Sequence, residues 1–212
     1  MNDGPPHAVP TGTFPDVVPV LTDGRVRLRA MSEEDLPAVV EQSNDLETVE
    51  WTGLPQPYDL GNAREFLAVH ASDWADPRGV ARCAIELIPH DGAPASPFAG
   101  IIDLRPGTKG DAWETRFVLH PAARERGAMS GALRLAARWA FDHGAASLYW
   151  CAARGHFASW RVAHACGFPP RDAAAAHCRP GARQHRRMGG FTASRTADGA
   201  THPVGRAGRP AR

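Results

Sequence analysis

The residues with the clearest chemical potential form a short basic turn, Arg124-Glu125-Arg126-Gly127-Ala128-Met129, before an apolar helical pattern that starts near Ser130. A helix N-terminus presents unpaired N–H groups and a partial positive charge. A glycine there lets the backbone approach a ligand, and the flanking arginines supply charge-assisted donors. The turn therefore predicts a seat for a phosphate or pyrophosphate group. The alternative interpretation is an ordinary solvated basic loop.

Two successive groups of predicted strands and helices must position this turn. Alternating and helical spacings predict a strand over 25–30, a capped helix from Ser32 to about Val40, a proline-rich loop over 51–58, a helix over 63–70 and strands over 80–88, 98–104 and 114–119. The period then changes, and the next elements are a helix over 130–141, a strand over 147–152 and a helix over 157–166. Antiparallel strands followed by a βαβα unit predict a mixed sheet flanked by helices, an α/β architecture of the α+β kind.

The composition fits a single domain with a sizeable core, because 43% of the 212 residues are hydrophobic. Residues 1–22 are rich in Pro and Gly and predict a flexible arm, residues 23–170 form the domain, and residues 171–212 predict a basic, disordered tail. Nine arginines against two aspartates give this tail a charge of about +7, although the net charge of the chain is +1.

The chain also lacks features of several other classes. Its four cysteines have no CxxC pair, so we expect reduced, mostly buried thiols and no metal site. No apolar run has the length of a membrane span, and the N-terminus lacks a basic-then-apolar signal. We therefore expect a cytoplasmic protein without a membrane partner. The sequence gives no indication of the oligomeric state.

Several motifs together resemble the GNAT superfamily of N-acetyltransferases. Residues 114–129 resemble its central strand and pyrophosphate loop, with Arg124-x-x-Gly127-x-Met129 at the family signature Gln/Arg-x-x-Gly-x-Gly/Ala. The helix over 132–141 and the segment 150–168 are also similar, the latter to the Gly-Asn-x-x-Ser…Gly-Phe pattern of the RimJ/RimL-like branch. The loop with Trp51 and Tyr58 matches that branch too. The resemblance runs from about residue 23 to residue 168.

The resemblance implies a GNAT-like sheet, splayed between two central parallel strands, that binds acetyl-CoA as the acetyl donor. The pantetheine arm would pair beside the strand over 114–119, the pyrophosphate would sit on the turn after residue 123, and the thioester would lie where the strands ending near Leu119 and Ala152 separate. The implied cofactor-binding residues are Phe117, Val118, Leu119, Arg124, Arg126, Gly127, Ala128, Met129, Ser130, His156 and Ser159. An amine acceptor, either a protein N-terminal α-amine or a small-molecule amine, would attack the thioester directly.

The catalytic roles are less sharply indicated. Ser159 stands at the motif serine and is the candidate proton donor to the leaving thiolate, although a first-turn serine also bonds its own backbone. Glu114 could act as the base, directly or through water, or be a solvated edge carboxylate. Trp51 and Tyr58 could wall the acceptor pocket or simply pack in the core. His120 is given no chemistry.

Three features of the sequence differ from the family pattern and argue against an active N-acetyltransferase. Glu125 places an acid beside the predicted phosphate site, and His156 replaces the usual Asn.

The third difference is the C-terminal tail. After Phe168 the composition changes to Ala, Arg, Gly and Pro, and only residues 188–193 faintly suggest a strand, although the fold needs further strands there. The tail could be a frameshifted or degenerate end, which would expose a sheet edge, or a basic arm for nucleic acid. Nine arginines without interleaved aromatics give nucleic-acid binding weak support. The alternative function is accordingly a catalytically impaired CoA-binding relic.

Overall fold

The computed structural model describes residues 17–76, 79–106, 112–153, 155–168 and 188–194. Its strands are β1 (Leu21–Thr22), β2 (Val26–Arg29), β3 (Ala81–Leu87), β4 (Ser96–Pro106), β5 (Ala112–Leu119), β6 (Ser147–Ala153) and β7 (Met188–Ser194). Its helices are α1 (Leu36–Asn44), α2 (Leu46–Trp51), α3 (Leu60–Ala75), α4 (Ala128–Asp142) and α5 (Phe157–Ala165), with 3-10 turns at Glu33–Asp35 and Pro121–Ala123.

The strands form one seven-stranded sheet in chain order, β1-β2-β3-β4-β5-β6-β7. All neighbouring strands are antiparallel except β5 and β6, which run parallel and are joined through α4. A parallel pair needs such a crossover connection, whereas antiparallel neighbours can be joined by hairpins. The predicted mixed sheet is therefore confirmed, with its parallel pair at the expected place.

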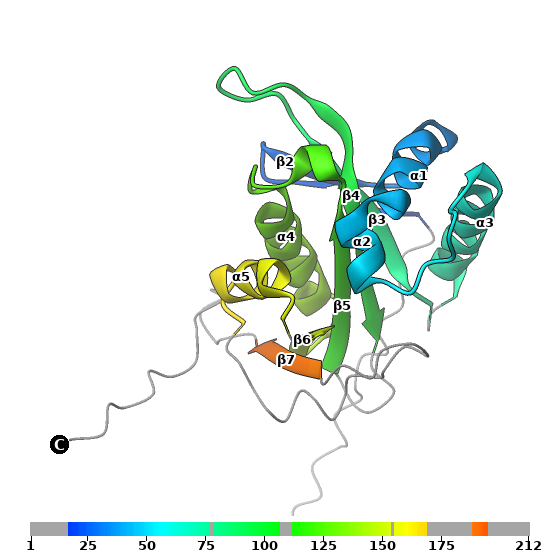
Figure 1. Ribbon diagram of the computed structural model, residues 1–212. Helices are drawn as coiled ribbons and strands as arrows, with labels where there is room; N and C mark the ends of the chain where they lie inside the picture. The colour runs from blue at the N-terminus through cyan, green and yellow to red at the C-terminus, as the bar shows by residue number, and fades with distance from the viewer. Residues whose placement is uncertain (1–16, 77–78, 107–111, 154, 169–187, 195–212) are drawn as a thin grey trace, which may run out of the picture.

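Helices cover both faces of the sheet, with α4 and α5 on one side and α1, α2 and α3 on the other (Figure 1). The alternation of strand side chains divides the core accordingly. Ile85 and Ile102 face a large cluster built around α4, whereas Ala84 and Ile101 face a smaller one built around α1 and α3. The helix α4 approaches β2 so closely that a Cβ on Gly131 would lie 2.6 Å from Val26 Cγ2.

The predictions of helices and strands hold for the described residues up to 168, with two omissions. One is β1. The other is α2, for which no element was predicted and whose last residue, Trp51, was expected to begin a loop; Asp45 caps this helix by accepting a hydrogen bond from the Thr48 N–H at 3.0 Å. None of the helices in the described part of the chain combines the length and hydrophobicity that a membrane span needs.

The C-terminal segment differs from its prediction. The faint strand signal becomes β7, which pairs with β6 from Ser147↔Ser194 to Ala153↔Met188. The prediction that the whole of 171–212 is disordered is thus wrong for residues 188–194, and the flexible arm predicted over 1–22 is wrong at Leu21–Thr22, which form β1 and pair with β2. Residues 1–16 and the rest of the C-terminal segment lie outside the described residues. β7 also covers the edge of β6 that a degenerate tail would expose.

The cysteines are only partly as expected. Cys83 and Cys166 are free and buried, and burial raises the pKa of the Cys83 thiol to about 12. Cys151 on β6 is disulfide-bonded, and its partner lies outside the described residues. The prediction that all four thiols are reduced is therefore wrong at Cys151, because spacing in the sequence carries no information about which residues the sheet brings near β6.

Candidate active site

The two parallel strands separate partway along their length. Residues 112–115 of β5 pair with residues 147–150 of β6, and the last pair is Thr115↔Trp150. Beyond it β5 continues to Leu119 and β6 to Ala153 without pairing to each other. The facing backbone groups of these two ends are therefore available to an extended ligand that carries its own amides. This splay lies where the sequence predicts the thioester.

The turn after β5 carries a run of unpaired backbone donors. Among the described residues, the N–H groups of residues 125–130 have no acceptor, and no side chain caps the N-terminus of α4. Gly127 takes φ 76° at the N-cap position and Glu125 takes φ 61°, so successive amides of the turn change direction. Converging amides at a helix N-terminus bind phosphate groups well. The turn thus has the backbone geometry that the sequence predicts for Ala128, Met129 and Ser130.

The two arginines of the turn point to protein partners instead. Arg124 forms a close ion pair with Asp45, the N-cap of α2, and lies 3.0 Å from a Glu47 carboxylate oxygen. This pairing lowers the pKa of Asp45. The guanidinium of Arg126 donates to the Pro94 carbonyl at 2.5 Å. Both side chains therefore brace the turn, and the predicted anion site consists of backbone amides rather than free guanidinium groups.

His120 fixes the start of the same turn. It is 7% exposed at the end of β5, and its Nδ1 accepts a hydrogen bond from the Ala122 N–H at 3.3 Å. Its Nε2 has no hydrogen-bond partner among the described residues and lies 3.5 Å from a Glu41 carboxylate oxygen. No chemistry is predicted for this histidine from the sequence. The available signal for its role in the turn is the motif His120-Pro121, because a side-chain acceptor before a proline commonly initiates a turn.

The predicted pantetheine strand presents one aromatic contact across the splay. Phe117, just past the last β5–β6 pair, stacks on Trp150 with ring centroids 6.0 Å apart. Phe117 and Leu119 pack against the α4 cluster, whereas Val118 packs against the α1 and α3 cluster. The three residues thus alternate across the sheet at the point where it opens.

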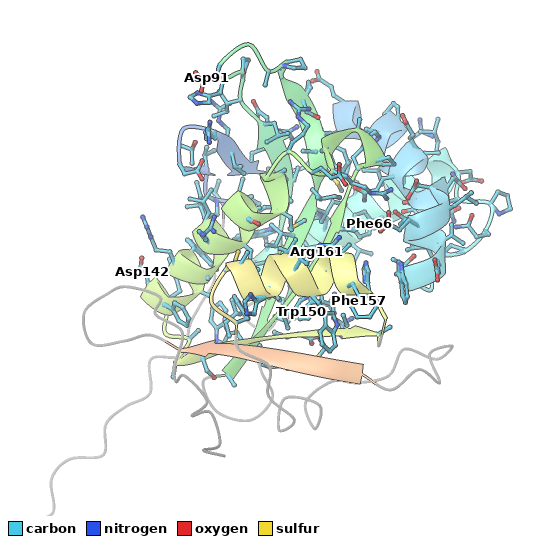
Figure 2. All side chains as sticks on the ribbon, turned by 60° about the vertical axis from the view of Figure 1, so that its left-hand side comes forward. Phe66, Asp91, Asp142, Trp150, Phe157 and Arg161 are labelled. Carbon is cyan, nitrogen blue, oxygen red and sulfur yellow. The ribbon has the colours of Figure 1, made fainter. Side chains whose placement is uncertain are left out.

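On the other side of the splay, α5 begins at Phe157 with His156 as its N-cap (Figure 2). Ser159 is 8% exposed in the first turn of α5, and its hydroxyl has no hydrogen-bond partner in the described part of the chain. The alternative prediction, in which this hydroxyl bonds its own backbone, is therefore not what the structure has. His156 stacks flat on Trp51, with centroids 4.6 Å apart and an interplanar angle of 3°.

Glu114 lies in a different environment from the one its proposed role needs. It pairs in register with Tyr149, within the part of β5 that is still joined to β6. Its carboxylate accepts a hydrogen bond from Arg116 Nε at 2.7 Å, and its side chain is 12% exposed. The Glu114 carboxylate is therefore not freely solvated, and it is already paired with the Arg116 guanidinium.

Tyr58 is buried rather than lining an open pocket. It is 6% exposed and belongs to the cluster of α1 and α3 with Leu36 and Phe98. Its backbone exchanges hydrogen bonds with the Asn44 side-chain amide at 2.7 and 3.0 Å. The packing alternative describes this geometry, and a contact between Tyr58 and an acceptor stays a prediction.

Several solved structures have a similar fold, and their names identify them as acetyltransferases. A GNAT-family acetyltransferase from Bacillus anthracis superposes with a TM-score of 0.65 at 16% identity, covering 82% of this chain and 97% of that one. RimJ from Mycobacterium smegmatis, solved with CoA-disulfide, gives 0.68 at 15% identity, covering 88% and 91%. Spermidine N-acetyltransferase from Vibrio cholerae, solved with CoA and spermine, gives 0.60 at 16% identity, covering 80% and 95%. At these identities the likeness concerns the fold.

The fold and the splayed site define an N-acyltransferase class, and the family model for the acetyltransferase (GNAT) domain matches residues 25–169. The chain belongs to this family. Membership confirms the predicted N-acetyltransferase class and acetyl-CoA as the acetyl donor. A search of curated protein sequences finds no match.

Proposed function

We propose that this protein transfers the acetyl group of acetyl-CoA to a primary amine by direct attack within a ternary complex. The acceptor is either the α-amine of a protein N-terminus or a small-molecule amine. A cytoplasmic location fits this role and remains part of the proposal.

The observation that carries the proposal is the run of unpaired N–H groups at residues 125–130, next to the splay of β5 and β6. A diphosphate on these amides is a fixed distance from the splay, so the attached pantetheine arm is directed between the two strands. Its amides can pair with the free edge of β5 at residues 117–119, as an added strand does. Glu125 is exposed, so its carboxylate can turn toward water and away from the diphosphate.

The acetyl group would then lie near the first turn of α5. Ser159 is placed there with a hydroxyl that has no partner among the described residues, and it protonates the departing thiolate. The amine approaches from the side of α2, past Trp51. Structures of similar fold include a ribosomal-protein-serine acetyltransferase and a spermidine N-acetyltransferase, both from Vibrio cholerae, which support a protein acceptor and a polyamine acceptor respectively.

Calorimetric titration with acetyl-CoA tests the site directly. We expect saturable binding by the wild-type protein, and binding weaker by about tenfold or more in Gly127→Val, equivalent to about 1.4 kcal/mol. The reason is that a β-branched residue resists the φ of 76° that turns the amides toward the ligand.

The matched control is Gly24→Val. Gly24 also has a positive φ, 89°, and open space around its Cβ, but it lies in the turn between β1 and β2. Equal loss of acetyl-CoA affinity in both variants would assign the effect to general strain. Well-folded wild-type protein that produces no heat of binding with acetyl-CoA contradicts the proposed function.

A further inference from the structure

The stacked pair of Trp51 and His156 lies at the mouth of the splay. Trp51 is the last residue of α2, and His156 precedes the first residue of α5, just beyond the end of β6. The two rings are nearly parallel at 4.6 Å, a separation typical of favourable ring stacking. Stacking on Trp51 covers one face of the imidazole, and His156 as a whole is half-buried.

The helix α2 bridges the two strands that separate. Its N-terminus is tied to the turn after β5 by the ion pairs of Arg124 with Asp45 and Glu47. Its C-terminus is tied to the loop after β6 by the stacking of Trp51 on His156. The imidazole is therefore fixed between the two strand ends.

Attack by an amine on a thioester requires a group that accepts a proton from the nitrogen. Glu114 is engaged by Arg116 and lies below the splay, where β5 and β6 are still paired. In contrast, neither ring nitrogen of His156 has a hydrogen-bond or ion-pair partner in the described part of the chain. His156 is also the N-cap of α5, and Ser159 is the third residue of that helix, so both side chains belong to the first turn of the same helix.

We propose that His156 accepts the proton of the attacking amine, and that Trp51 is the positioning residue that holds its ring. The inference rests on the proposed acetyl transfer. As the amine nitrogen bonds to the thioester carbon, the carbonyl electron pair moves to oxygen and the nitrogen loses a proton to His156. When the intermediate collapses, the C–S bond breaks and the thiolate takes the Ser159 hydroxyl proton. Ser159 recovers a proton from His156, which returns to its neutral form, leaving an amide and the CoA thiol.

The surroundings of His156 keep it able to accept a proton at neutral pH. Burial lowers its pKa, and the positive charge of Arg124 lowers it further, while Glu47 and Glu50 of α2 oppose this shift. The pKa of His156 thus lies below the ordinary histidine value of about 6.5, so the ring is neutral at neutral pH. Glu47 and Glu50 stabilise the imidazolium that forms during the reaction.

The test uses two nucleophiles that differ in their need for a base. Methylamine has a pKa near that of lysine, about 10.4; its unprotonated fraction attacks, and the nitrogen of the resulting adduct is a weak acid that needs a base to take its proton. The nitrogen of a hydroxylamine adduct is much more acidic and can lose its proton to water, so this nucleophile depends less on a base. We expect His156→Asn to lower the rate constant with methylamine by about 10²–10⁴-fold, and that with hydroxylamine far less. Asn is the usual family residue, so acetyl-CoA affinity should be retained.

Further variants separate proton transfer from packing. Trp51→Phe, which keeps a ring, should retain more methylamine activity than Trp51→Leu. The exposed His164 on the same helix supplies the matched control, and His164→Asn should leave both rates unchanged. In the wild type, kcat/KM calculated on the concentration of unprotonated methylamine should fall in acid as His156 becomes protonated, and this limb should be absent in His156→Asn.

The outcomes are distinguishable from failure of the proposed function. Loss of acetyl-CoA binding by the wild type contradicts acetyl transfer itself. Three results overturn the role of His156. They are an equal decrease of the rate constants with methylamine and hydroxylamine in His156→Asn, an acidic limb that is unchanged in this variant, and no transfer to methylamine by a wild type that binds acetyl-CoA.

Discussion

His70 on α3 shows what burial does to a single ionisable side chain in this protein. It is 3% exposed, and its Nε2 donates to the Arg82 carbonyl at 2.8 Å, which leaves Nδ1 as the unprotonated nitrogen. Nδ1 is buried and has no hydrogen-bond partner among the described residues. A second proton would therefore enter a position without an acceptor, and burial accordingly lowers the pKa of His70.

This arrangement predicts a decrease in stability in mild acid. Above the unfolded-state pKa of about 6.5 His70 is neutral in both states, and its full contribution is present. As the pH falls from this value toward the lower folded pKa, the unfolded state binds the proton preferentially, so the free energy of unfolding decreases. His70→Gln keeps a donor for the Arg82 carbonyl but cannot titrate. Urea unfolding at about pH 7.5 and about pH 5.5 should show a smaller difference in this variant than in the wild type.

The control replaces the exposed His164 with Gln. This change should leave the pH dependence of the unfolding midpoint as in the wild type. An equal pH dependence in His70→Gln and the wild type would exclude His70 as its source.

Single side chains also mark the limit of what the sequence predicts. Gly127 stands out in the sequence because glycine lets the backbone approach a ligand, and the structure gives it a positive φ at the N-cap of α4, while its contact with a ligand stays a prediction. The engagement of Arg124 by Asp45 and Glu47 is not predictable, because it joins residues 79 positions apart whose proximity depends on the whole fold. The same holds for the stacking of Trp51 on His156.

At the scale of elements, α4 depends on a close approach to β2. A Cβ on Gly131 would lie 2.6 Å from Val26 Cγ2 and 3.3 Å from an Asp23 carboxylate oxygen. Val26 is stiff about χ1 and 3% exposed, so it has little room to yield. Glycine at this helix position therefore serves packing, although it lowers helix propensity.

We expect Gly131→Ala to be destabilising despite the better helix propensity of alanine. Overpacking of this kind typically costs about 1–3 kcal/mol, more than the gain in propensity of about 1 kcal/mol. The double variant Gly131→Ala with Val26→Ala should recover stability relative to the sum of the single changes. Urea unfolding of the four proteins gives this interaction energy, and strict additivity would contradict the proposed clash.

Elements with strong periodicity were predicted well, and short ones were not. The strands β3, β4 and β5 and the helix α4 carry clear alternation or helical spacing over seven or more residues. The helix α2 has only six residues, two of them β-branched, so its signal is weak and its Asp45 cap is its main determinant. β7 contains two glycines in seven residues, and its pairing with β6 rather than its own propensity defines it.

At the scale of the whole molecule, the sheet extends beyond the splay through β7. β6 pairs with β5 over only four residue pairs but with β7 over seven. Most of the backbone pairing that holds β6 in place therefore comes from its outer neighbour. The position of β6, the strand that precedes His156, thus depends on β7, a segment far in the sequence from the predicted active-site motifs.

Truncation should reveal this dependence. A chain that ends at Phe168 lacks β7, and we expect a lower thermal midpoint and concentration-dependent aggregation through the unpaired edge of β6. A chain that ends at Ser194 keeps β7 and should retain the thermal midpoint of the full chain. Equal stability of the two truncated chains would show that β7 contributes little.

The order of the strands in the sheet repeats their order in the chain. During synthesis, each new strand of the growing chain therefore meets a partner that has already been made, and β5 needs only α4 to be completed before β6 can join it. β7 is made last, after α5, so the nascent protein passes through a stage in which β6 has an open outer edge. At that stage the unpaired edge of β6 exposes the incomplete chain to association with other chains.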